Sequence, residues 1–231
     1  MERTGRILVA YQVISFVGVI LAGWFMTQPT PNTAATRNLM IYSLFSFINI
    51  LGAVATVFPH RCGTDTNLSL DMNASRYTSA LGVQIVHGHH HGCQGFRDHE
   101  FAAGGKSFCA ACTGLLVGAI LSIALSTSYF FSTTVYPVYT GYVGLAFVVL
   151  GLLYIPLLQN PWTGFRTIIN AMFVLGFSLV LFSVDRLGDP VTDLIVIGLC
   201  VYWMYTRIQS SRWGHDKICA GCEEPCDLRA E

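Results

Sequence analysis

The feature that most restricts the fold of this chain is a stretch of 59 residues, 107–165, that contains no Asp, Glu, Lys or Arg. An α-helix of about 20 residues crosses a bilayer core of about 30 Å, so this stretch is long enough for two crossings. Over the whole chain, 53% of the residues are hydrophobic and 11% are charged. Soluble domains carry about 25% charged residues, so this composition cannot cover a water-facing surface. We therefore expect an integral membrane protein.

Apolar runs without charges predict six membrane-spanning helices. The expected spans are residues 7–26, 39–58, 114–135, 138–158, 167–184 and 190–206. The first run is too long for the apolar core of a secretory signal, so we count it as a helix. The expected fold class is an all-α membrane protein, a bundle of about six transmembrane helices with a cytoplasmic Cys/His-rich loop and a C-terminal tail. Its expected parts are 1–58 with two helices, the loop 59–113, 114–206 with four helices, and the tail 207–231.

The 13 Lys and Arg residues predict which side of the membrane each segment faces. All of them except Arg37 and Arg186 fall on the side that holds both termini and loop 59–113. Short cytoplasmic loops carry the excess of basic residues, so we expect a cell-membrane protein with both termini in the cytoplasm. The chain has no basic patch interleaved with aromatic residues, so no nucleic-acid partner is expected. The expected partners are the lipid bilayer and other membrane subunits.

The cysteines indicate metal chemistry on that same side. Seven of the 8 cysteines fall there, and a reducing cytoplasm disfavours disulfides. Two pairs have the spacing Cys-x-x-Cys, namely Cys109 with Cys112 and Cys219 with Cys222. Thiolates at this spacing reach one zinc ion at a Zn–S distance of about 2.3 Å, so the two pairs predict a four-thiolate site that joins the loop to the tail. Further candidate ligands are Cys62, Cys93, Cys226, His87, His89 and His91.

Several alternatives to a zinc site stay open. An iron–sulfur cluster is also held by four cysteines, although neither spacing matches the ferredoxin runs. A Cys-x-x-Cys pair also forms redox disulfides, but a thioredoxin-like pair needs a βαβ context that the pattern does not indicate. Haem would need histidines facing each other inside the bundle, and none of the six expected spans contains one. The histidine run 87–91 is either the ion-collecting loop of a metal transporter or sensor, or an exposed loop without a ligand role.

Two shorter patterns predict local structure. In the segment 73–88, Tyr77, Leu81 and Ile85 recur every four residues, which predicts a short amphipathic helix, either at the membrane interface or packed under the bundle. Gly114 and Gly118 form a small-xxx-small pair, which predicts close packing of the third span against a neighbouring helix. His60 and His215 stand near cysteines, and we expect each to be a bystander rather than a ligand.

The segment 93–118, "CQGFRDHEFAAGGKSFCAACTGLLVG", resembles the central motif of the DUF2085 family of small prokaryotic membrane proteins. The matching residues are Cys93, Gln94, Arg97, Phe101, Cys109, Ala110, Cys112, Thr113, Gly114 and Gly118. The family pattern has a His between the first Cys and Gln, which this chain lacks, and an Arg where this chain has Ala111. The resemblance implies that Cys93, Cys109 and Cys112 belong to one unit, and it implies no particular activity.

The chain has no recognisable catalytic motif and no pair of carboxylates placed for acid–base catalysis. We therefore expect a non-catalytic protein with a structural zinc site, acting as a structural or accessory subunit of a larger membrane complex. The alternatives are a membrane redox protein with an iron–sulfur cluster or haem, and a metal-ion transporter or sensor.

Overall fold

The structure is a computed structural model that describes residues 2–29, 39–57, 77–80, 83–86, 98–103, 106–132, 136–158 and 162–220. Its helical elements are α1 (Glu2–Thr27), α2 (Leu39–Val57), α3 (Ala110–Phe131), α4 (Val138–Leu153), the π-helical turn η4 (Tyr154–Leu158), α5 (Thr163–Asp185) and α6 (Pro190–Ala220). Two antiparallel hairpins precede α3, and they pair β1 (Tyr77–Ala80) with β2 (Val83–Val86) and β3 (Glu100–Ala103) with β4 (Lys106–Cys109).

All six α-helices are long and apolar enough to cross a membrane, with η4 continuing the α4 span. Large apolar side chains cover their outer faces, and Val13, Ile20 and Phe47 are each more than half exposed. Such exposure is unfavourable in water and favourable in the apolar interior of a bilayer. A helix also suits the bilayer because its backbone hydrogen bonds are made within the helix. The expected bundle of six helices, each long and apolar enough to span a membrane, is confirmed.

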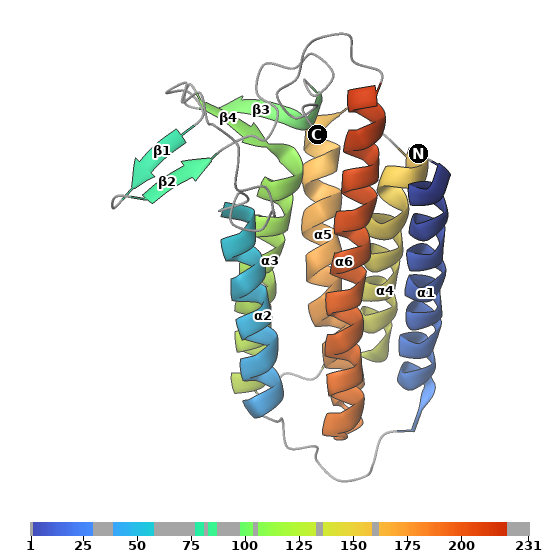
Figure 1. Ribbon diagram of the computed structural model, residues 1–231. Coiled ribbons are helices and arrows are strands. Elements are labelled where there is room, and N and C mark those ends of the chain that lie inside the picture. Colours follow the sequence, from blue (N-terminus) through green and yellow to red (C-terminus); the bar gives the residue numbers. More distant parts are fainter. Residues whose placement is uncertain are drawn as a thin grey trace.

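Helix α5 is the central helix of the bundle. It packs against α3 on one side and α4 on the other, while α2 lies against α3 and α1 lies against α6 (Figure 1). The hairpin β3–β4, the start of α1 and the end of α6 lie at the same end of the bundle, the upper end in Figure 1. We call this the hairpin end.

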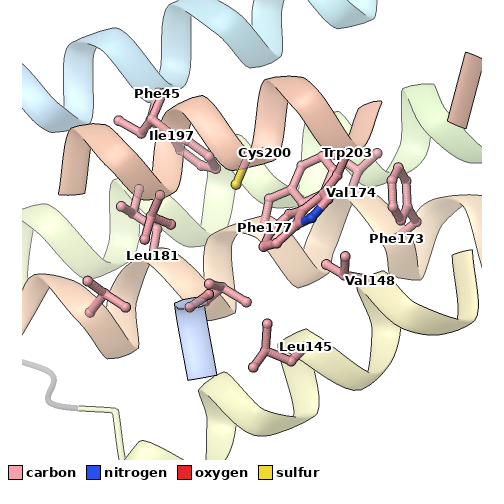
Figure 2. Close-up of a cluster of buried hydrophobic side chains, with 14 of the residues drawn as sticks. Phe45, Leu145, Val148, Phe173, Val174, Phe177, Leu181, Ile197, Cys200 and Trp203 are labelled. Carbon is pink, nitrogen blue, oxygen red and sulfur yellow. The ribbon is translucent and has the colours of Figure 1, made fainter. Parts of the chain in front are cut away.

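The core is formed mainly by side chains of α4, α5 and α6 (Figure 2). Trp203 is fully buried and stacks on Phe177 with ring centroids 6.1 Å apart. Its indole Nε1 donates a hydrogen bond of 3.0 Å to the carbonyl of Ser15, which ties α6 to α1. The same two helices are joined by a 2.9 Å bond from Ser15 Oγ to Thr206 Oγ1. The hydrophobic effect does not drive helices together inside lipid, so close packing and interhelical hydrogen bonds such as these hold the bundle together.

The turn between α5 and α6 shows how local sequence ends one helix and starts the next. Gly188 adopts a φ of 67°, a left-handed conformation that glycine reaches without steric cost. Asp189 then caps α6, since its carboxylate accepts hydrogen bonds of 3.2 Å from the backbone N–H groups of Val191 and Thr192. This turn lies at the end of the bundle opposite the hairpin end (Figure 1).

The amphipathic helix predicted within 73–88 is wrong. The chain forms the β1–β2 hairpin there, with Tyr77 paired to Val86 and Ala80 paired to Val83. The period of four was misleading, because Thr78, Val83, Ile85 and Val86 are β-branched and favour strands. Two residues separate the strands in sequence, and the second is Gly82, as two-residue hairpin connections favour.

The expected boundaries of several helices also need correction, since α1 starts at Glu2 rather than at residue 7 and α5 at Thr163 rather than at residue 167. Helix α6 continues from Arg207 to Ala220, so the first part of the predicted tail is helical and the sixth span is the longest helix, not the shortest. Helix α3 starts at Ala110 rather than at residue 114. A hydropathy pattern detects only the part of a helix that lies in lipid, whereas a helix continues as long as its backbone bonds do, and no proline interrupts residues 191–220.

Candidate metal centre

The two cysteines of the first Cys-x-x-Cys pair lie where β4 ends and α3 begins. Cys109 is the N-cap of α3, with extended backbone angles of φ −72° and ψ 120°, and Cys112 lies on the first turn. The hydroxyl of Thr113 donates a 2.9 Å hydrogen bond to the carbonyl of Cys109, which closes this turn. The extended backbone of Cys109 is typical of an N-cap, so the strand passes directly into the helix and holds both thiols at one place.

The surroundings of Cys109 favour its thiolate form. A hydrogen bond from the Cys112 thiol, supported by the N–H groups of Cys112 and Ala111, lowers the pKa of Cys109 to about 7. Burial and the carboxylate of Glu100 oppose this change, because both disfavour a negative sulfur. The N–H groups of this first turn also form the positive end of the helix dipole, which favours a negative sulfur at the N-cap position. A thiolate near pH 7 is both a metal ligand and a nucleophile.

The hairpin places further polar groups beside these thiols. Glu100 pairs with Cys109 across the β3–β4 ladder, and Phe101 pairs with Phe108, their rings stacked with centroids 5.8 Å apart. Just before β3, the ring of His99 contacts the ring of His215 on α6, with centroids 6.0 Å apart. The residue just before the β3–β4 hairpin therefore meets the end of α6.

That contact concerns residues that the sequence analysis passed over. His99 was not considered there, and His215 was expected to be a bystander. His215 and Cys219 are four residues apart on α6, a spacing that puts two residues on one helix face. This spacing was a signal that could have drawn attention to His215. Nothing in the sequence indicated the partner His99, because the two histidines are 116 positions apart.

The other predicted ligands are distributed as follows. Cys219 lies in the last turn of α6, at the hairpin end of the bundle. Seven candidates lie outside the described residues: Cys62, Cys93, Cys222, Cys226, His87, His89 and His91. Within the described ranges, no group of three or more His, Cys, Asp or Glu side chains is close enough to hold a metal ion. Cys109 and Cys112 are therefore the predicted ligands that the structure brings together.

Comparison with known proteins adds no further assignment. No family model, curated protein or solved structure matches this chain.

Proposed function

We propose that this multi-pass membrane protein binds zinc through Cys109 and Cys112, and that the metal joins the β3–β4 hairpin to the C-terminal segment. The protein would then act as a structural or accessory subunit of a larger membrane complex. The observation that supports this proposal best is the pair of thiols on one turn, with Cys109 holding a pKa of about 7. Zinc binds thiolates, so a thiol that is already half ionised at neutral pH loses its proton to the metal at little cost.

The contact between His99 and His215 supports a site completed from the C-terminal segment. It brings the end of α6, with Cys219 one turn beyond His215, to the same end of the bundle as Cys109. In our proposal Cys219 and Cys222 supply the other two ligands of a tetrahedral site, as their Cys-x-x-Cys spacing predicts. Cys62, Cys93, Cys226 and the histidines 87, 89 and 91 are the reserve candidates.

A redox function is the second candidate, and one observation favours it. A cysteine at a helix N-terminus with a lowered pKa, followed three residues later by a second cysteine, is also the arrangement of dithiol redox sites. An iron–sulfur cluster on the same thiolates belongs to this candidate as well.

The side of the membrane is also part of the proposal. Arg166 and Arg207 lie inside α5 and α6 rather than in connecting segments, yet both are at the hairpin end. Without these two, the described part of the hairpin end still holds five basic residues against Arg186 at the opposite end, namely Arg3, Arg6, Lys106, Arg212 and Lys217. This excess supports a cell-membrane protein whose hairpin end and both termini are cytoplasmic.

Elemental analysis of the purified, untagged protein tests the metal proposal. We expect about one zinc ion per chain in the wild-type protein and none bound tightly in Cys109→Ser/Cys112→Ser. The matched control is Cys200→Ala, which removes a thiol buried in the apolar core and should keep the zinc. Iron with visible absorbance, or a Cys109–Cys112 disulfide in a metal-free protein, would replace the zinc proposal with the redox candidate.

A further inference from the structure

Two arginine side chains are buried at the hairpin end without a described acid beside them. Arg166 on α5 is 9% exposed and Arg207 on α6 is 4% exposed. Between them lie Tyr154 of η4 and Asn170 of α5, both of which are buried. A charged side chain this deeply buried is normally paired with an opposite charge, since burial without a partner is very unfavourable.

The contacts of the two guanidinium groups are with neutral groups. Arg166 donates from Nε to the hydroxyl of Tyr154 at 3.3 Å, and Arg207 donates from Nη2 to Oδ1 of Asn170 at 2.8 Å. Both guanidinium carbons lie about the same distance from the Tyr154 ring centroid, 6.0 Å for Arg166 and 5.9 Å for Arg207. Asn170 is itself held by a 2.7 Å bond from its Nδ2 to the carbonyl of Arg166. Tyr154 thus lies next to both guanidinium groups, and Asn170 links the guanidinium of Arg207 to the backbone of Arg166.

The buried arginines include a hydrogen-bond donor that has no acceptor. Nε of Arg207 is fully buried and has no acceptor. Among the described residues neither arginine forms an ion pair with a carboxylate. The acids of α5 and the start of α6, Asp185 and Asp193, lie at the opposite end of the bundle. Asp216 is nine residues beyond Arg207, which puts it about half a turn round the α6 axis, on the other face.

The positive charge is strengthened by the start of α3. The carbonyl of Ala110 accepts a 3.2 Å bond from Thr167 Oγ1, so the N-terminal turn of α3 is packed on α5 between Arg166 and Asn170. Helix N-termini carry partial positive charge and unpaired N–H groups. Arg207 interacts electrostatically with Cys109. One thiolate carries a single negative charge, so it cannot neutralise two guanidinium groups. A thiolate bound to zinc would in addition have its charge balanced by the metal.

We propose that Arg166 and Arg207, positioned by Tyr154 and Asn170, bind an oxyanion of the phosphate class at the hairpin end of the bundle. Guanidinium groups present a planar fork of N–H donors that matches phosphate oxygens and outperforms a lysine ammonium in this geometry. The phosphate belongs either to a soluble phosphate compound or to a phospholipid headgroup, because the site lies near the end of the membrane-spanning helices. This inference is independent of the metal proposal, since none of its four residues is a candidate metal ligand.

Thermal unfolding of the purified full-length protein in detergent tests the site, with two probes added separately. One probe is inorganic phosphate, compared with chloride at equal ionic strength, and the other is phosphatidylglycerol in mixed micelles. We expect a saturable rise in the unfolding temperature of the wild-type protein with at least one probe. A response to inorganic phosphate assigns the site to soluble phosphate compounds, and a response to phosphatidylglycerol alone assigns it to the lipid headgroup.

The variants separate recognition from general charge. Arg207→Lys and Arg166→Lys keep the charge and lose the fork, so the responding probe should bind each of them about tenfold more weakly or worse. Arg207→Gln removes a buried charge, so its unfolding temperature without probe should equal or exceed that of the wild type, while its response to the probe is lost. The control Arg212→Gln removes a charge from an exposed position on the same helix and should respond as the wild type does. Equal responses of all variants, or no response of the wild type to either probe, would overturn the proposal.

Discussion

The position of Cys109 at the junction of β4 and α3 determines the chemistry of its thiol. The strand brings the residue in, the helix dipole favours negative charge at its sulfur, and Cys112 donates a hydrogen bond from the first turn. The spacing Cys-x-x-Cys was enough to select both residues from the sequence. The lowered pKa could not be read from it, because that depends on where the strand ends and the helix starts.

The first prediction concerns the ionisation of Cys109 in protein freed of metal by a chelator. Alkylation by iodoacetamide, followed at the Cys109 peptide by mass spectrometry, should titrate with a midpoint near pH 7, the pKa of this thiol. The rate should fall about tenfold per pH unit below that midpoint, since only the thiolate reacts. Cys112→Ala removes the main stabilising donor and should move the midpoint to higher pH, whereas Glu100→Gln removes an opposing charge and should move it to lower pH.

Cys200→Ala is the control for this titration and should leave the midpoint where it is, since Cys200 is buried in the apolar core. A midpoint above about 8.5, the ordinary value for a thiol, with no effect of Cys112→Ala, would show that Cys109 is not activated.

The buried arginines show what sequence patterns miss at this scale. Arg166 and Arg207 stand at the ends of apolar runs, where basic residues normally reach the aqueous interface, so Arg166 was assigned to a loop and Arg207 to the C-terminal tail. Their burial depends on Tyr154 and Asn170, which are 12 residues before Arg166 and 37 residues before Arg207 respectively. Contacts at such separations follow from the packing of three elements and have no local signature.

At the scale of elements, the close approach of α3 to α5 fixes the hairpin end. A Cβ atom on Gly114 would lie 2.3 Å from the carbonyl oxygen of Thr167, and one on Gly118 would lie 2.7 Å from that of Ala171. The prediction of close packing from this glycine pair is confirmed. Because Cys112 lies only two residues before Gly114 on the same helix, the α3–α5 contact also fixes the position of the helix turn that carries the thiol pair.

The second prediction tests that contact. Gly114→Ala should lower the free energy of unfolding by about 1–3 kcal/mol, because the added methyl group meets a backbone carbonyl that cannot move aside. Gly198→Ala on α6 is the matched control, since nothing lies within 4 Å of its added Cβ. Unfolding titrations of both variants in mixed micelles provide the comparison. Equal stability of the two variants would mean that α3 and α5 are further apart than described.

The sequence predicted well that six helices exist. It predicted less well where these helices begin and end, and it gave the wrong structure for the segment 77–86. Six apolar runs are a strong signal, because lipid demands both length and hydrophobicity from a spanning helix. The polar end of α6, from Arg207 to Ala220, has neither the length nor the hydrophobicity of a spanning segment. A contact within this part of the helix is that of Lys217 with the Trp213 ring, whose centroid lies 3.7 Å from Nζ. The β1–β2 hairpin was mistaken for a helix because the four-residue spacing was given too much weight. In so short a segment that spacing is weak evidence for a helix, and the β-branched residues favour strands.

At the scale of the whole molecule, the two ends of the bundle differ in the sign of their buried charges. The hairpin end holds the cysteine pair and the two buried arginines. The opposite end holds Asp185 and Asp193, both buried, with Tyr129 donating a 2.9 Å hydrogen bond to Asp185. This difference agrees with a protein that has one fixed orientation in the membrane.

The third prediction concerns that orientation. A fluorescent protein fused after Glu231 should fluoresce in a bacterial host, and alkaline phosphatase fused at the same place should be inactive, because we propose a cytoplasmic C-terminus. Alkaline phosphatase inserted within residues 30–38 should be active. The reverse pattern would place the cysteine pair on the outer side, where disulfide chemistry is favoured over a reduced metal site.

The most direct test of the central claim is the X-ray absorption spectrum of the purified protein at the zinc edge. We predict a first shell dominated by sulfur at about 2.3 Å, with two fewer sulfur atoms per zinc, or no zinc, in Cys109→Ser/Cys112→Ser. A shell of nitrogen and oxygen alone, or wild-type protein without stoichiometric zinc, would contradict a thiolate zinc site at the start of α3.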